Sequence, residues 1–239
     1  MNAPTPYESD IATAAALMAD PTRAAMLRAM LDGRPLAAGE LARVAGVTAA
    51  TASAHLARLL DGGLVAVTRQ GRHRYYRLAG YEVAEALEAV ARVSADIPVR
   101  TLRQSREAQA LAAARTCYDH LAGRAGVALL ESMLEQGILT EPDEDAFEVT
   151  SSGAGTIRTF GINVGELRRG CERGRRRFAG TCLDWTERRR HLSGALATAI
   201  TTRLFETGWI ERGPRRRSVV ITEAGRKGLA ETFGWTGAP

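Results

Sequence analysis

The chain has 239 residues, of which 45% are hydrophobic and 25% charged, and its net charge is +5. This length and composition suit a soluble protein with a small domain and a second region of similar or larger size. An apolar run of membrane-spanning length and a signal-peptide pattern are both missing from the sequence, which argues against a membrane-spanning class and predicts a cytoplasmic location.

Two helices are predicted at the start of the chain, over residues 8–19 and 21–32. Asp20 is a suitable N-cap for the second helix, and Pro21 occupies its first position, where proline is well tolerated. The first helix has an apolar stripe that suits either a core or an interface between subunits; the stripe is formed by Ile11, Ala14, Ala15 and Met18.

A short helix, a tight turn and a longer helix are predicted between Glu40 and Leu60. The short helix ends at Gly46, and Thr48 is a good N-cap for the longer helix. Gly62-Gly63 stops the longer helix, with one glycine free to adopt a left-handed conformation.

The longer helix is amphipathic. Ala52, Leu56 and Leu59 share one face, which we expect to pack against Leu41 and Val44. The opposite face carries small residues, which would let this helix enter a major groove of DNA.

A basic β-hairpin follows, with strands expected over residues 64–67 and 75–78. Its turn carries three arginines and a histidine around Gly71. A helix-turn-helix followed by such a wing is typical of proteins that bind duplex DNA. We therefore expect DNA contacts from Thr48, Ala49, Ala50, Thr51, Ser53, Ala54, His55 and Arg58 on the helix, and from Arg69, Arg72, His73 and Arg74 on the hairpin.

The chain resembles the ArsR-type winged-helix regulators over roughly residues 10–95. The matching segments are Asp20-Pro21-Thr22-Arg23, Leu41-Ala42, Thr51-Ala52-Ser53-Ala54-His55-Leu56 and Gly63-Leu64-Val65. The resemblance implies a homodimeric bacterial regulator, usually a repressor of a palindromic operator that an effector releases. It also places a histidine at position 55, where we expect a packing or phosphate-binding role.

The remaining chain is predicted to be mainly helical, which gives an α+β fold with small hairpins overall. After a helix over residues 81–95, Pro98 separates a DNA-binding and dimerisation domain (1–97) from a regulatory domain (98–239). Helices are expected over about 101–121 and 127–136. A helix–glycine–hairpin pattern repeats at a spacing of 71 to 73 residues, which predicts winged-helix-like units at about 98–161 and 190–235.

The regulatory region contains a possible metal site. Cys117 and His120 are three residues apart and would share a face of the predicted helix, while Cys182, Asp184 and His191 lie in one later segment. Cys117, His120 and Cys182 could form a soft site for zinc, cadmium or an arsenic(III)-like ion. Buried thiols and hydrogen-bonded histidines are the alternative interpretation, and a single redox-sensitive cysteine is another.

Two features of the ArsR-type metal sensors are missing. Those relatives often carry Cys-x-Cys in the helix before the turn, or Asp and His ligands on the helix after the wing, and neither is present here. No cofactor is expected, and a small organic effector, or no effector, fits better than a metal, with Tyr118, Trp185 and Trp209 as candidate pocket residues.

Arginines cluster over residues 168–177, 188–190 and 215–217. They could extend the DNA footprint or form a solvated face paired with acidic residues such as those of 141–148.

The sequence predicts a regulator and not an enzyme, because no nucleotide-binding glycine turn, catalytic triad or carboxylate pair is evident. An enzyme is thus the competing class that the sequence argues against, and a winged-helix adaptor that binds no duplex DNA is a third interpretation.

Overall fold

The computed structural model describes residues 10–94, 98–143, 146–172 and 176–237, and the chain divides into two compact units, Met1–Val93 and Ser94–Pro239. Helices predominate and the sheets are small and antiparallel, so the predicted α+β class is confirmed. Among the described helices, none has both the length and the apolar character that crossing a bilayer requires.

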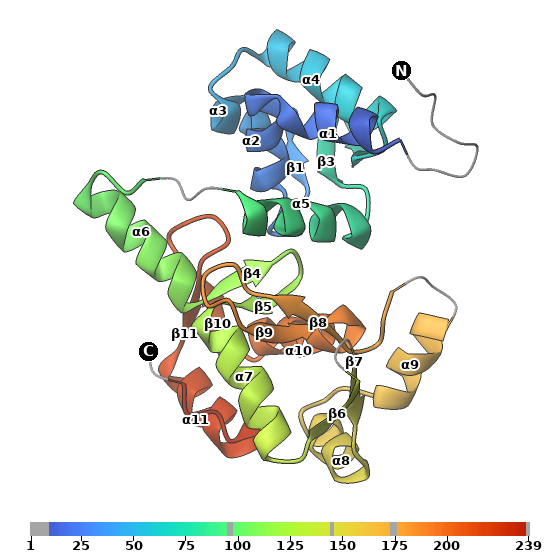
Figure 1. The fold of residues 1–239 in the computed structure, drawn as a ribbon, viewed down its shortest axis with the longest axis vertical. Helices are drawn as coiled ribbons and strands as arrows, with labels where there is room; N and C mark the ends of the chain where they lie inside the picture. The colour runs from blue at the N-terminus through green and yellow to red at the C-terminus, as the bar shows by residue number, and fades with distance from the viewer. Residues whose placement is uncertain (1–9, 95–97, 144–145, 173–175, 238–239) are drawn as a thin grey trace. The chain divides into compact units, whose positions relative to one another are not determined.

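The first unit is a winged helix-turn-helix (Figure 1). Its three strands form one antiparallel sheet in the order β1-β3-β2. The elements are α1 (Ile11–Ala19), α2 (Pro21–Ala29), β1 (Leu36–Ala37), α3 (Ala38–Ala45), α4 (Ala49–Asp61), β2 (Val65–Gln70), β3 (His73–Leu78) and α5 (Tyr81–Val93).

Local capping explains where these helices begin and end. The Asp20 carboxylate accepts a hydrogen bond from the backbone N–H of Arg23, and the Thr48 hydroxyl accepts one from the N–H of Thr51. Gly46 ends α3 at φ 67°, and Gly63 follows α4 at φ 69°, both in the left-handed region. The expected caps are therefore present.

The core of this unit matches the amphipathic pattern with one exception. Leu41, Ala52, Leu56 and Leu59 are buried as expected, but Val44 is 44% exposed, so its expected place in the core is wrong. Val44 lies in the last turn of α3, which the chain leaves at Gly46. The predicted helix over 8–19 begins at Ile11 among the described residues, and its residues 8 and 9 lie outside them.

The second unit contains two copies of one helix–hairpin–helix–hairpin–helix order. The first copy comprises α6 (Leu102–Ala113), β4 (Arg115–Cys117), β5 (His120–Ala122), α7 (Arg124–Glu135), β6 (Leu139–Asp143), β7 (Ala146–Val149) and α8 (Ser151–Thr159). The second comprises α9 (Val164–Glu172), β8 (Gly180–Leu183), β9 (Arg190–Ser193), α10 (Gly194–Glu206), β10 (Ile210–Arg212), β11 (Val219–Ile221) and α11 (Glu223–Phe233).

The predicted helix over 101–121 is wrong in its second half. The helix ends at Ala113, and residues 115–122 form the β4–β5 hairpin, in which Cys117 pairs with His120 across the strands. The alanine-rich segment 108–114 has high helix propensity, but Tyr118 adopts φ 59°, a turn conformation that a right-handed helix does not accommodate.

Equivalent hydrogen bonds support the repeat. The Thr150 hydroxyl donates to the Gly137 carbonyl and accepts from the Gly153 N–H, and the Thr222 hydroxyl does the same with Gly208 and Gly225. Each threonine therefore caps its helix and anchors the preceding hairpin.

The two copies exchange strands instead of packing as separate units. The Phe147 N–H of β7 donates to the Ala179 carbonyl just before β8, and the Val219 N–H of β11 donates to the Ala114 carbonyl just before β4. The helices are exchanged as well, because α7 packs on β9 and α10 on β5. β4, β5, β8 and β9 accordingly lie together in the middle of this unit (Figure 1).

Candidate functional site

The candidate DNA-reading surface is the outer face of α4. Ala49, Ala50, Ser53 and Ala54 are exposed, and so is Arg58 near the end of the helix. The Ser53 hydroxyl donates to the Ala49 carbonyl 2.9 Å away, and the Thr51 hydroxyl lies 2.9 Å from that of Thr48. The hydroxyl groups on this face therefore already form hydrogen bonds within the helix and its N-cap. The side chains are short, so the face projects little from the helix.

His55 differs from its neighbours on α4. Its side chain is only 17% exposed, and its Nδ1 lies 3.5 Å from the Asp20 carboxylate at the start of α2. This position links α4 to the N-cap of α2, which supports the packing role.

The wing is a tight basic hairpin. β2 and β3 pair from Val65↔Leu78 out to Gln70↔His73, so the strands extend further than predicted and leave only Gly71 and Arg72 in the turn. Gly71 adopts φ 58°, which suits glycine. Arg69, Arg72, His73 and Arg74 are all exposed and available to phosphates.

A second candidate site lies in the second unit, where the two central hairpins meet. Each hairpin contributes one cross-strand pair, Cys117↔His120 in β4–β5 and Cys182↔His191 in β8–β9. One ligand atom from each of the four residues lies within 4.8 Å of all the others. The structure therefore brings together the three candidate ligands named from sequence and adds His191.

The distances within this cluster are short. The Nε2 atoms of His120 and His191 are 3.2 Å apart, and the sulfurs of Cys117 and Cys182 are 4.0 Å apart. Cys117, His120 and His191 are buried, while Cys182 is half-buried.

A carboxylate lies behind each histidine. The Nδ1 of His120 is 3.4 Å from Asp119, and the Nδ1 of His191 is 3.6 Å from Asp184. Both carboxylates thus lie on the side of the ring opposite the clustered Nε2 atoms.

Each carboxylate is held by its own arginine. Arg176 forms two hydrogen bonds with Asp119, of 2.7 and 2.8 Å, and Arg115 donates to Asp184 over 2.9 Å. Asp184 also accepts a 2.7 Å hydrogen bond from the Gly123 N–H. These contacts cross between the repeats and restrict both carboxylates.

The same contacts explain the electrostatics. Although burial opposes it, hydrogen bonds from His120 and Arg176 lower the pKa of Asp119 to about 2. Burial also opposes ionisation of Asp184, but Arg115 holds its pKa well below the usual value. Both groups are therefore carboxylates at neutral pH.

The surroundings shift the pKa values of the two histidines in opposite directions. Burial opposes protonation of His120, but Cys117 and Asp119 raise its pKa to about 9. Burial, and then the charge on His120, lowers the pKa of His191 well below its usual value. A protonated and a neutral imidazole can share the short Nε2 contact in the metal-free protein.

A repeated sequence indicates His191 as the fourth ligand, beyond its place in the same segment as Cys182. Thr116-Cys117-Tyr118-Asp119 is followed directly by His120-Leu121-Ala122-Gly123, whereas Thr181-Cys182-Leu183-Asp184 is separated by residues 185–190 from His191-Leu192-Ser193-Gly194. That insertion changes the Cys–His spacing, so the two copies are hard to align by eye.

The three aromatic residues predicted to line a pocket lie in different surroundings. Trp185 packs under Arg115, whose guanidinium is 4.5 Å from the ring centre, and Trp209 packs against Phe160 at 5.1 Å. Tyr118 lies at the turn of the β4–β5 hairpin.

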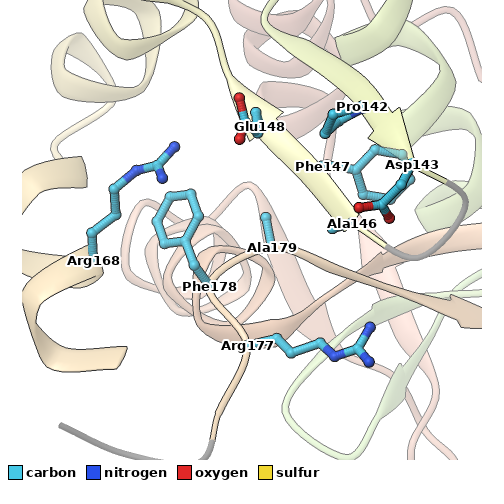
Figure 2. A pocket seen from close by; sticks show the side chains of 9 residues that line it. All are labelled: Pro142, Asp143, Ala146, Phe147, Glu148, Arg168, Arg177, Phe178 and Ala179. Atoms are coloured by element: carbon cyan, nitrogen blue, oxygen red, sulfur yellow. The ribbon is translucent and has the colours of Figure 1, made fainter. Parts of the chain in front are cut away.

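A cavity of about 650 Å³ lies elsewhere in the second unit (Figure 2). Arg168 comes from α9 and stacks on Phe178, with its guanidinium 4.3 Å from the ring centre, while Phe147 and Glu148 come from β7. Aromatic and charged groups on one cavity suit a small organic molecule with a polar end.

The arginine clusters make several internal contacts. Arg189 pairs with Glu131, Arg190 with Glu141, and Arg215 with Glu107. Arg217 donates to the Thr116 carbonyl over 3.0 Å. These contacts fit the acidic-partner interpretation, whereas Arg173 and Arg175 lie outside the described residues.

An exposed small-residue helix face beside a basic wing defines the class of a winged helix-turn-helix DNA-binding protein. In agreement, residues 18–68 match the family model described as a helix-turn-helix domain.

Two curated relatives extend the comparison. The HTH-type transcriptional regulator YdfF of Bacillus subtilis is 44% identical over 217 residues, covering 91% of this chain and 94% of YdfF. The HTH-type transcriptional regulator CmtR of Mycobacterium bovis is 41% identical over 86 residues, covering 36% of this chain and 72% of CmtR. The crystal structure of NolR from Sinorhizobium fredii matches with a TM-score of 0.34 at 27% identity, covering 39% of this chain and 96% of NolR.

The chain belongs to the HTH-type transcriptional regulators, in line with its resemblance to the ArsR type, and carries a C-terminal extension beyond the helix-turn-helix domain. The similarity to YdfF includes that extension, since it covers almost the whole of both chains.

Proposed function

We propose that the protein is a homodimeric transcriptional repressor that binds a palindromic operator and is released by an effector held in the second unit. The observation that carries the DNA-binding part is the exposed face of α4, lined by Ala49, Ala50, Ser53 and Ala54, next to the arginines of the wing. Two such helices in a symmetric dimer would enter successive major grooves about 34 Å apart.

Exposed apolar side chains support the dimer. Ile11 on α1 is 76% exposed, and Val90 and Val93 on α5 are 50% and 86% exposed. Apolar groups exposed on the first and last helices of a small unit are unfavourable in water. Covering them with a second copy of the chain lowers the free energy and so favours a dimer.

Two places in the second unit suit an effector. The cavity beside Arg168 and Phe178 suits an organic molecule. The cluster of Cys117, His120, Cys182 and His191 supports a second candidate function, a repressor that responds to a metal ion.

Selection of genomic DNA fragments by the purified protein tests the proposed function. We expect enrichment of a discrete palindromic site, and a gel shift on that site that weakens when the effector is added. Zinc, cadmium, arsenite and a set of small carboxylates are the first additives to compare. Enrichment of no sequence over random DNA would contradict the operator-binding proposal and favour an adaptor.

A further inference from the structure

We propose that Cys117, His120, Cys182 and His191 bind one tetrahedral divalent metal ion of the zinc class, and that this ion joins the two repeats of the second unit. The proposal concerns the second unit alone and requires neither DNA nor a dimer.

The spacing of the ligand atoms carries the proposal. Zinc lies about 2.3 Å from sulfur and about 2.0–2.1 Å from imidazole nitrogen, so a tetrahedral site separates two sulfurs by about 3.8 Å and two nitrogens by about 3.3 Å. The sulfurs here are 4.0 Å apart and the Nε2 atoms 3.2 Å apart. The two sulfurs and the two nitrogens are therefore already close to these separations, and all four ligand atoms lie within 4.8 Å of one another.

The donor set selects the kind of ion. Two thiolates and two imidazoles favour borderline-soft ions such as zinc, cadmium and cobalt(II), whereas magnesium and calcium prefer oxygen ligands. Two thiolates also neutralise a divalent charge, which suits a site where three of the four ligands are buried.

The carboxylates complete the arrangement expected around metal-bound histidines. A histidine that binds a metal through Nε2 usually donates its Nδ1–H to a carboxylate, which sets the tautomer and the ring orientation. Asp119 and Asp184 occupy that position behind His120 and His191, at 3.4 and 3.6 Å. His191 Nδ1 lacks a hydrogen bond within the usual limit, and a small rotation of the ring toward Asp184 would provide one.

Four protein ligands leave no coordination position for a substrate. Closed sites of this kind are structural and contribute to folding free energy, in contrast to catalytic sites that keep a water ligand. Because each repeat supplies one cysteine and one histidine, the ion would hold the β4–β5 and β8–β9 hairpins together.

The first test uses the full chain and cobalt(II) as a probe. After chelator treatment under reducing conditions, we expect one cobalt ion per chain to produce the visible bands of tetrahedral cobalt and the near-ultraviolet charge-transfer absorption of cobalt–thiolate bonds. Zinc should displace the cobalt and abolish both signals. Binding of no cobalt, or an octahedral spectrum without thiolate absorption, would overturn the proposal.

Variants provide the second test. Cys182→Ser removes a half-buried ligand, and we expect it to weaken cobalt binding at least about tenfold and to reduce the charge-transfer band. Cys171→Ser is the matched control, because Cys171 lies on α9 outside the cluster, and it should leave the spectrum unchanged. Circular dichroism establishes that both variants are folded, and the wild-type titration remains decisive if Cys182→Ser does not fold.

A disulfide is the competing explanation for the two cysteines. Its formation would require the sulfurs to approach from 4.0 Å to about 2.05 Å. Mass spectrometry of the protein purified without reductant should show two free thiols at Cys117 and Cys182 that zinc protects from alkylation. A Cys117–Cys182 crosslink in the purified protein, with no bound metal, would contradict the metal site.

Discussion

At the scale of single residues, the wing arginines and the small residues of α4 make different kinds of contact with DNA. Arg72 and Arg74 are exposed near the wing turn, where they suit phosphates, whereas Ser53 and Ala54 lie on the helix face that suits base edges. Substitutions at the two places should therefore change affinity and specificity separately.

Replacing Arg72 with alanine should weaken binding to every duplex by a similar factor. Loss of one phosphate contact should also lower the slope of log affinity against log salt by about 1. Fluorescence anisotropy with operator and random duplexes at several salt concentrations measures both effects. A loss confined to the operator would show that Arg72 reads sequence.

Replacing Ser53 with leucine should impair operator binding more than binding to random DNA. The larger side chain would hold α4 away from the base edges, so we expect the ratio of the two affinities to fall by about tenfold. The same anisotropy assay measures this ratio. Arg58→Ala is the control on the same helix, and it should reduce both affinities together.

Asp184 is the buried residue whose loss should cost the most stability. It forms an ion pair with Arg115, and both side chains are almost completely buried. Asp184→Asn would leave the arginine without a countercharge, and we expect a loss of about 3–5 kcal/mol in the free energy of unfolding. Urea denaturation of the full chain should show this loss in the second unit, and an unchanged midpoint would contradict it.

At the scale of secondary-structure elements, one glycine in each repeat lets a helix backbone approach the preceding hairpin. Gly153 does so for α8 and the β6–β7 hairpin, and Gly225 for α11 and the β10–β11 hairpin. A Cβ at Gly153 would collide with the Ile138 carbonyl, and one at Gly225 with the Trp209 carbonyl. The repeat therefore needs glycine three residues after Thr150 and Thr222, because that spacing brings helix and hairpin backbones into contact.

Gly153→Ala should accordingly destabilise the second unit by about 1–3 kcal/mol. Gly155→Ala is the matched control in the same helix, because its Cβ would meet no atom within 4 Å, and it should be neutral or slightly stabilising. Thermal unfolding followed by circular dichroism compares the two variants. Equal melting temperatures would show that the close approach at Gly153 is relaxed in solution.

The elements that could be predicted from sequence are those with strong local signals. Thr48, Gly63 and Gly71 determine the local conformation through capping and turn chemistry, so α4 and the wing can be predicted from sequence. β1 and the β4–β5 hairpin could not be, since β1 has only two residues and depends on β3, and the alanine-rich approach to β4 favours helix.

The candidate metal cluster shows the same division. Residue type alone indicates Cys117, Cys182 and His120 as candidate ligands. The prediction that Cys117 and His120 lie on one helix is wrong, because they pair across the β4–β5 hairpin, and His191 is a fourth ligand that the prediction lacks. The contacts within the cluster join positions 65 and 71 residues apart, and such contacts leave little local trace in sequence.

At the scale of the whole molecule, the exposed apolar residues of α1 and α5 lead to a prediction about assembly. A variant with both Ile11→Asp and Val93→Asp should be a folded monomer, because charges at these exposed positions leave the monomer core intact but are costly in a covered interface. Sedimentation velocity measures the change in mass, and operator affinity should fall with it as the second half-site is lost. A variant that stays dimeric would place the interface elsewhere.

The exchanged strands have a consequence for the ancestry of the second unit. A polypeptide with only the first repeat would keep the β4–β5 pair but would lack the β11 contact beside β4. It would also carry only one cysteine and one histidine of the cluster, so a second identical molecule would have to supply the others. Gene duplication followed by fusion converts such an association into a folding step within one chain, whose outcome no longer depends on dilution. Two fused halves would be free to diverge, and the six extra residues between Asp184 and His191 are the kind of difference that such divergence would produce.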